Sequence, residues 1–199
     1  MGMETSLGPV EYVVAGNNPG EWLEVKRAVL LQSPVLKGWI EDPTTCPFRK
    51  DGAIHLDACE PEVVKEVFFQ MENGYFERQH GALTYARIYK LALALGLSIL
   101  GHVALFALKR CSFSAETFLD IAIKAASDGL QDDRDFRDWI TETFIDHRGE
   151  IKRSHAFSMV ITQGSQNTRL LYELLMTCLV SAERDRDINR HGEKGRLSL

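Results

Sequence analysis

The stretch WLEVKRAVLLQSPVLKGWI, residues 22–40, decides the fold of this chain. It opens with β-prone residues at 22–25, in which apolar and polar side chains alternate. A second β-prone run, YVV at 12–14, precedes them across GNNPG at 16–20, a dense turn signal. Residues 10–27 are therefore expected to form a β-hairpin.

The remainder of that stretch predicts two short helices separated by a proline. A helical turn over 28–33 must end before Pro34, because proline disfavours the helical conformation in the residue before it. Pro34 suits the first turn of the second helix. Apolar side chains recur there with helical spacing at Val35, Leu36, Trp39 and Ile40. Prolines and a glycine then indicate a loop over 43–52.

One strand and three helices are predicted between this loop and Cys111. Residues 54–57, IHLD, alternate apolar and polar side chains, as a half-buried strand does. The helix over 60–73 begins with proline and acidic residues, which suit the positive end of a helix. Two apolar helices, 84–95 and 97–110, complete an α+β unit, and both are expected to be buried.

The run from Leu91 to Leu108 contains no charged residue and reaches the length of a membrane span. Gly96 and Gly101 interrupt it, and Lys90 and Lys109 bound it with no hydrophobic margin. Two buried helices joined near Gly96 are therefore favoured over a span, and no membrane association is predicted.

Residues beyond Cys111 show no strand-like alternation and predict an all-helical region. Their apolar residues form three helical stripes: Phe118, Leu119, Ala122 and Ala126; Phe136, Trp139, Ile140 and Phe144; and Leu170, Leu171, Leu174, Leu175 and Cys178. Residues 183–199 carry mixed charges and have little to bury, which predicts a disordered tail.

Composition excludes several classes of protein. The chain is 45% hydrophobic and 26% charged, as a globular protein is. Its net charge of −5 and lack of a basic run argue against nucleic-acid binding. The cysteines include no C-x-x-C pair, so reduced thiols are expected instead of a zinc site or a disulfide framework. The first residues show no signal-peptide pattern, so a cytoplasmic or nuclear location is expected.

No catalytic residue, cofactor site or metal site is predicted. The six histidines include no i, i+4 pair, and His102, within the apolar run, is interpreted as a hydrogen-bonded core histidine. His55 and Asp57 could orient an imidazole for base catalysis, but on a strand face they are interpreted as solvated. Residues 96–101 lack the lysine of a phosphate-binding loop, and the acids at 132–135 lack the continuation of a calcium loop. An enzyme with an unrecognised site is kept as an alternative.

The motifs up to Cys111 together resemble the BTB/POZ domain, a relative of elongin C. Residues 23–30, LEVKRAVL, are similar to the family's Phe-x-Val-His-Lys-x-Val-Leu segment, with Lys26 where histidine is usual, and SPVL at 33–36 is similar to its Ser-x-x-Phe continuation. Residues 54–64 resemble the family's strand and its Pro-Glu-x-Phe helix start. YKLALALGLSIL at 89–100 resembles its Leu-Ala-x-x-Tyr-x-Ile-x-x-Leu segment.

Beyond residue 111, FLD at 118–120 and DFRD at 135–138 look like the helical extension of BTB proteins common in filamentous fungi. The resemblance implies an α+β BTB/POZ fold, a small sheet with helices packed around it, followed by an all-helical subdomain. The expected organisation is a BTB/POZ domain over 10–111, a helical extension over 112–182, and a charged tail over 183–199.

The resemblance implies a non-catalytic protein–protein interaction module, a scaffold or adaptor. Family members homodimerise, recruit other partners, or act as substrate-recruiting adaptors of cullin-RING ubiquitin ligases. Dimer-forming members often carry an extra strand and helix before the hairpin, whereas nine residues precede Val10, which argues against a swapped dimer. Glu11 and Arg27 would match the pocket charges of dimeric members, but an exposed ion pair explains them equally well.

Cullin binding in the family uses an apolar-x-Glu element in the loop after the second short helix. The corresponding loop here, residues 41–52, contains no such triplet, and FRK at 48–50 reverses the charge. A cullin adaptor is therefore the second hypothesis, after a general interaction module. The predicted contact residues are Phe48, Tyr75 and Phe76, aromatic residues in loops, although each could instead fold back to anchor its loop.

Overall fold

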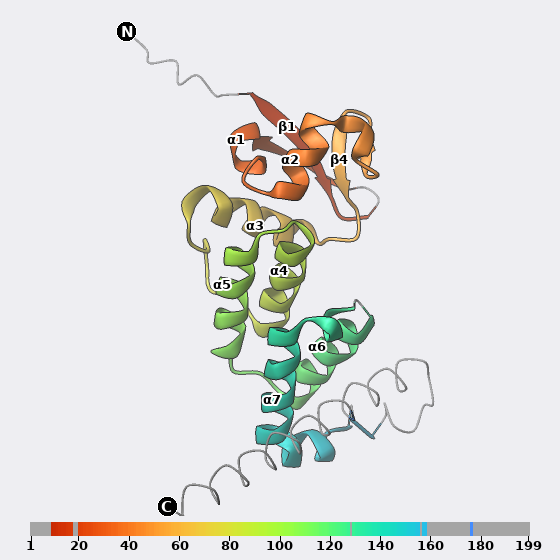
Figure 1. Cartoon of the computed structure of the whole chain (residues 1–199). Helices are drawn as coiled ribbons and strands as arrows, with labels where there is room; N and C mark the ends of the chain where they lie inside the picture. Colours follow the sequence, from red (N-terminus) through yellow and green to blue (C-terminus); the bar gives the residue numbers. More distant parts are fainter. Residues whose placement is uncertain (1–8, 18–19, 128, 156, 159–175, 177–199) are drawn as a thin grey trace, which may run out of the picture. The chain divides into compact units, whose positions relative to one another are not determined.

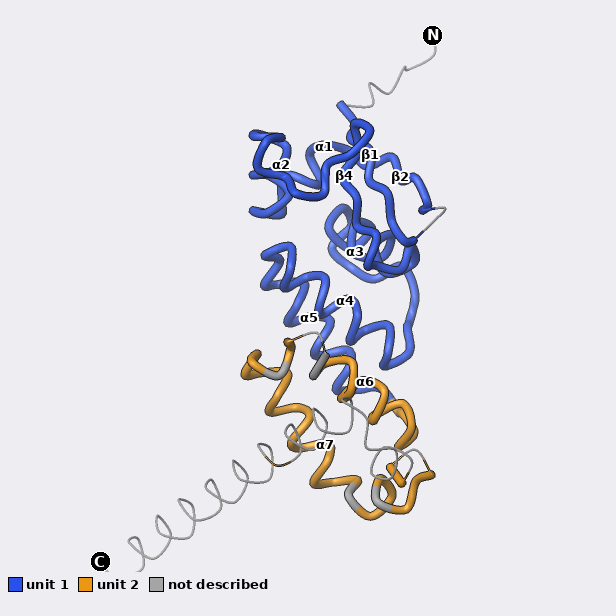
Figure 2. Tube along the Cα trace, turned by 90° about the vertical axis from the view of Figure 1, so that its right-hand side faces the viewer, with its two compact units in different colours: residues 1–111 blue, residues 112–199 orange. Residues whose placement is uncertain are grey.

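The computed structural model describes residues 9–17, 20–127, 129–155, 157–158 and 176. It divides into two compact units, residues 1–111 and residues 112–199, which are described separately (Figure 2). The first unit combines a mixed β-sheet with α-helices, and the described part of the second is helical (Figure 1). The expected α+β class is thereby confirmed.

The first unit contains a four-stranded sheet in the order β2-β1-β4-β3. Its strands are β1 (Val10–Ala15), β2 (Glu21–Lys26), β3 (Arg49–Lys50) and β4 (Ala53–Leu56). The predicted hairpin of β1 and β2 is present, with Val13 opposite Leu23. On its other side β1 runs parallel to β4, with Val13 opposite Ile54. The two-residue β3, which pairs antiparallel with β4, lies in the stretch predicted to be loop.

The helices of the first unit are α1 (Arg27–Leu30), α2 (Pro34–Glu41), α3 (Pro61–Asn73), α4 (Ala82–Ala94) and α5 (Ser98–Lys109), with a 3₁₀ turn η1 (Pro43–Thr45). The neighbouring parallel strands are β1 and β4, and the long connection that such a pair requires contains β2, α1, α2, η1 and β3. The expected helix over 84–95 begins two residues earlier, at Ala82.

Ser33 determines where α2 begins and connects it to the end of α4. Its fully buried hydroxyl accepts a hydrogen bond from the backbone N–H of Leu36 at 3.1 Å. The same hydroxyl donates to the carbonyl oxygen of Leu95 at 2.6 Å. An N-cap serine satisfies one of the unpaired donors of a first helical turn, and here it also satisfies an acceptor just past another helix.

The apolar run 91–108 folds as two helices that lie side by side, as predicted (Figure 1). They are joined at Gly96, whose φ of +69° is in the left-handed region that glycine adopts at low cost. Over the residues that the structure describes, no helix is both long enough and apolar enough to cross a lipid bilayer. The expectation that both helices are buried is wrong for α5, because one of its faces is exposed to solvent.

The second unit contains α6 (Ala115–Ser127), a 3₁₀ turn η2 (Leu130–Asp132) and α7 (Arg134–Arg153). Its core contains most of two predicted stripes: Phe118, Leu119, Ala122, Phe136, Trp139, Ile140 and Phe144 are all buried. Asp133 caps α7 by accepting a hydrogen bond from the N–H of Phe136 at 2.9 Å. The third predicted stripe, over 170–178, and the predicted tail over 183–199 lie outside the described residues.

Candidate protein-interaction surface

One face of α5 consists of apolar side chains that reach solvent. Ile99, Val103 and Phe106 are 81%, 39% and 61% exposed. Their spacing of i, i+4 and i+7 places them on one side of the helix. The opposite side packs into the core through Leu100, Ala104, Leu105 and Leu108. Since contiguous apolar surface on a protein marks interaction sites, we treat Ile99, Val103 and Phe106, hereafter the α5 stripe, as the candidate surface.

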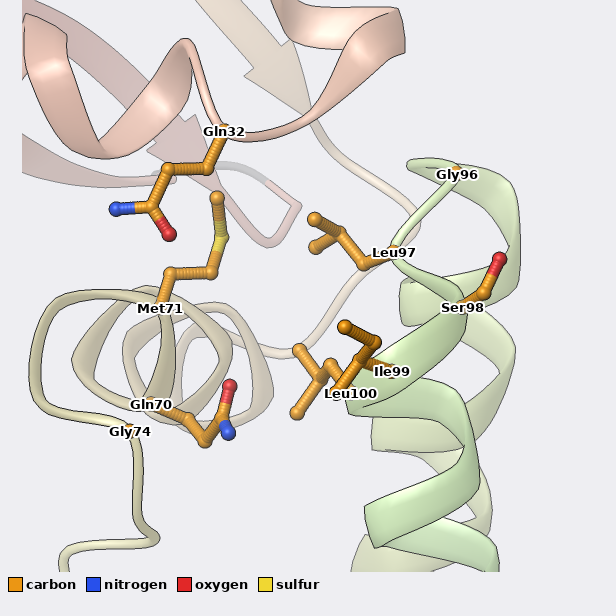
Figure 3. Close-up of a pocket in the computed structure, with 9 residues that line it drawn as sticks. All are labelled: Gln32, Gln70, Met71, Gly74, Gly96, Leu97, Ser98, Ile99 and Leu100. Atoms are coloured by element: carbon orange, nitrogen blue, oxygen red, sulfur yellow. The ribbon is translucent and has the colours of Figure 1, made fainter.

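A pocket of about 460 Å³ opens beside the first residue of the α5 stripe. The side chains that line it are Gln32, Gln70, Met71, Leu97, Ser98, Ile99 and Leu100. Figure 3 shows Leu97, Ile99 and Leu100 pointing toward α3, from which Met71 and Gln70 face them. Its lining is mostly apolar, with two amides that can fix the orientation of a bound group, as in most ligand pockets.

The other end of the α5 stripe is basic. Lys109 and Arg110 are exposed, and residues 98–110 contain no acidic side chain. The guanidinium carbon of Arg110 lies 5.4 Å from the ring centroid of Phe106, a cation–π distance. The surface therefore runs from an uncharged pocket to a pair of cations.

His102 lies on the exposed side of α5, so its interpretation as a core histidine is wrong. Its Nδ1 lies 2.8 Å from the carbonyl oxygen of Ser98. Since a carbonyl oxygen only accepts hydrogen bonds, Nδ1 is the donor in this contact. The contact lies within the first turns of α5 and holds the ring against its own helix.

The loop between α3 and α4 carries two of the predicted contact residues, and they differ in burial. Tyr75 is more than half exposed, follows Gly74 at the edge of the pocket, and contacts Phe69 edge to face with 5.5 Å between ring centroids. Phe76 is half-buried, and its ring centroid lies 5.3 Å from that of Tyr85. Tyr75 thus lies near the pocket, whereas Phe76 anchors the loop.

Glu66 holds this loop from the buried side of α3. Its carboxylate accepts a hydrogen bond from the backbone N–H of Glu77 at 2.7 Å. Its other oxygen lies 3.0 Å from Nε2 of His80, at an ion-pair distance without hydrogen-bond geometry. The side chains of Glu66 and His80 are only 4% and 6% exposed. A buried carboxylate thereby fixes the loop that begins at the rim of the pocket.

Phe48, the third predicted contact residue, lies apart from the residues that line the pocket. Its ring is more than half exposed and contacts Trp39 of α2 edge to face, with 5.5 Å between centroids. A further exposed aromatic pair, Tyr12 and Trp22 of the hairpin, has its centroids 6.2 Å apart and was not predicted. The structure therefore does not bring the three predicted aromatic residues into one cluster.

Glu11 and Arg27 form the expected pair, and a second arginine joins them. Nη1 of Arg27 lies 3.1 Å from Oε1 of Glu11, and Nη2 of Arg49 lies 3.4 Å from Oε2. Sequence reasoning missed Arg49, because the short strand that positions it was not recognised. The side chains of Arg27, Arg49 and Glu11 are 39%, 25% and 13% exposed, so the cluster is part-buried.

His55 and Asp57, which could orient an imidazole, lie within reach of each other at the edge of the sheet. Nδ1 of His55 lies 3.3 Å from Oδ1 of Asp57, and its Nε2 lies 3.2 Å from the carbonyl oxygen of Lys50. Both ring nitrogens thus have partners within the sheet edge. Among the residues that the structure describes, no three histidine, cysteine or acidic side chains are grouped to hold a metal ion.

No protein-family model matches this sequence, and no curated protein matches it. The functional proposal therefore rests on the geometry and chemistry of the surface.

Proposed function

We propose that this chain is a non-catalytic protein-interaction module whose α5 stripe and adjoining pocket receive a partner protein. The observation that carries the proposal is the exposure of Ile99 and Phe106 on a helix whose opposite face packs into the core. Fully burying one such side chain is worth about 1.5–3 kcal/mol. The stripe therefore offers a partner several kilocalories per mole before the entropic cost of association is subtracted.

We further propose that residues 10–111 are a BTB/POZ domain and residues 112–182 its helical extension. This proposal rests on the motifs of the sequence and on the order of the elements: a hairpin, two short helices, a strand, and three helices. The capping of α2 by Ser33 gives a structural reason for a serine at the start of the Ser-x-x-Phe segment that SPVL resembles. A scaffold or adaptor role follows from this family assignment.

Two more specific partners are a cullin and a second copy of the chain. A separate measurement tests each of them. In the loop expected to face a cullin, Phe48 packs on Trp39, and Lys50 stands two residues after it, where the family's apolar-x-Glu element has an acid. Binding of recombinant cullin at micromolar concentration would favour the adaptor hypothesis. A doubled mass in light scattering would favour the homodimer.

The experiment compares proteins captured from a native lysate by the full chain and by two variants, using quantitative mass spectrometry. Ile99→Gln with Phe106→Gln makes the α5 stripe polar. Tyr12→Gln with Trp22→Gln alters a pair of aromatic side chains outside it that are 45% and 56% exposed. Circular dichroism first establishes that both variants are folded.

We expect a set of proteins captured by the wild-type chain and by the Tyr12/Trp22 variant to be lost with the Ile99/Phe106 variant. Equal capture by all three chains would refute the stripe as the interaction surface. Loss with the Tyr12/Trp22 variant alone would assign binding to the hairpin.

A further inference from the structure

We infer that the partner segment bound by the α5 stripe is an amphipathic α-helix with acidic residues at the end that meets Lys109 and Arg110. This inference rests on the proposed function and specifies the chemistry of the partner. Three features of the surface carry it: the spacing of the stripe, the distribution of charge along it, and the absence of free backbone groups on a helical surface.

The spacing of the α5 stripe matches that of another helix. Ile99 and Phe106 are seven residues apart, which corresponds to about 10 Å along the axis of α5. Apolar residues at i, i+3 or i+4, and i+7 of a partner helix cover the same length. Laid along α5, such a helix can place one terminal side chain in the pocket beside Ile99.

The distribution of charge along the surface indicates which charges the ends of the partner helix carry. The pocket end is lined by uncharged side chains, including Gln32, Gln70 and Met71. The opposite end carries Lys109 and Arg110, with no acidic residue on α5 to neutralise them. A carboxylate on the partner can bind the guanidinium of Arg110 in a bidentate geometry while its apolar residues cover Phe106.

An extended peptide fits this surface less well than a helix. A bound strand gains its affinity by hydrogen bonding to free backbone groups at a sheet edge. Between its first and last turns the backbone groups of α5 are paired inside the helix, so an extended segment laid along the stripe would leave its own groups facing apolar side chains. A helix satisfies its backbone internally and presents only side chains.

A second copy of the chain is disfavoured as the occupant by its charge. Two α5 helices packed in parallel would bring two copies of Lys109 and Arg110 together, and antiparallel packing would place each pair against the uncharged end of the other stripe, without an acid on either helix. Like charges placed together at an interface oppose association. A partner with acidic flanks meets no such repulsion.

The first test selects a display library of helical peptides, randomised on one face and at both flanks, against the full chain. Peptides that also bind the Ile99→Gln, Phe106→Gln variant are removed. We expect enriched peptides with apolar residues at i, i+3 or i+4, and i+7, and with Asp or Glu at one end. Enrichment of peptides with basic or uncharged flanks, or of peptides that are not helical, would overturn the inference. So would a selection in which no peptide binds the wild-type chain better than the variant.

The second test measures the dissociation constant of one enriched peptide by fluorescence anisotropy. Lys109→Glu with Arg110→Glu should weaken its binding about tenfold, because it replaces two attractive charge pairs with repulsive ones. The matched control, Lys37→Glu with Lys50→Glu, reverses two exposed lysines away from α5 and should leave the constant within about twofold. Equal weakening by both variants, or by neither, would contradict a specific role for the two cations.

The failures of the two proposals are distinguishable. If lysate capture depends on the α5 stripe but the selected peptides are not acidic helices, the proposed function stands and the partner class is wrong. If capture is unaffected by Ile99→Gln with Phe106→Gln, both the proposed function and the proposed partner class fail. If the wild-type chain self-associates and this variant does not, the occupant of the α5 stripe is a second copy of the chain and not a partner helix.

Discussion

Gly96 lies directly against Pro34, so closely that a Cβ atom at position 96 would come 2.7 Å from Cγ of the proline ring. Its backbone is also in the left-handed region, with φ of +69°. Gly96 thus joins α4 to α5 at a point where neither a side chain nor an ordinary backbone conformation fits. The same residue lies at the edge of the pocket beside the α5 stripe.

Gly96→Ala should lower the free energy of unfolding by about 2–5 kcal/mol, measured by urea denaturation followed by tryptophan fluorescence. A left-handed alanine costs about 1–2 kcal/mol, and overpacking against Pro34 adds about 1–3 kcal/mol. Gly74→Ala is the matched control, because Gly74 has a φ of +80° but a Cβ atom added to it would meet no atom within 4 Å. Gly74→Ala should therefore lower the free energy of unfolding only by the cost of a left-handed alanine. Equal decreases in the two variants would show that contact with Pro34 is unimportant.

Glu66→Ala should open the loop that carries Tyr75 and Phe76. The substitution leaves the N–H of Glu77 without its acceptor and His80 without its carboxylate, and an unsatisfied buried polar group costs about 1–3 kcal/mol. Limited trypsin digestion measures the opening at Arg78, where we expect faster cleavage. Glu66→Gln keeps an oxygen acceptor and should cleave at an intermediate rate. Unchanged cleavage in both variants would show that Glu66 does not hold the loop.

Burial raises the pKa of the Cys59 thiol, and the charge of Lys90 lowers it in part. Alkylation of Cys59 by iodoacetamide, followed by peptide mass spectrometry, should therefore have its pH midpoint above that of a free cysteine. Lys90→Met removes the opposing charge and should move the midpoint higher still. Cys111, whose pKa is raised by burial alone, is the internal control and should not respond to Lys90→Met. A lower midpoint at Cys59 in Lys90→Met would contradict this account.

The raised pKa of Cys59 also sets the sign of a stability change with pH. The folded chain holds the thiol proton more tightly than the unfolded chain, in which a cysteine pKa is about 8.5. The stabilisation that this thiol contributes is fully present below about pH 8.5. It decreases as the pH rises above that value, because the unfolded chain loses its thiol proton at a lower pH than the folded chain does.

Local sequence signals predicted most of the first unit because each element has its own signature. The turn at 16–20, Pro34 at the start of α2, and Gly96 between α4 and α5 mark boundaries that the structure shows. The strand β3 escaped prediction because two residues carry no periodicity, and Arg49, which it positions beside Glu11, was missed with it.

The α5 stripe could not be predicted for a different reason. Periodicity reveals a buried face only when the opposite face is polar, and α5 is apolar on both sides. Nothing in the run 98–108 therefore distinguishes Phe106, which faces solvent, from Leu105, which faces the core. That choice depends on the side chains of α3 and α4 against which α5 packs, and the periodicity of α5 itself carries no information about them.

The most direct test of the α5 stripe as an interaction surface is site-specific photo-crosslinking in a native lysate, with p-benzoylphenylalanine placed at Phe106 or, as the control, at Trp22. Both side chains are more than half exposed, so they offer comparable access to a crosslinking partner. We predict that a discrete protein is crosslinked from position 106 and not from position 22. Crosslinks from position 22 alone, or from neither position, would contradict the account.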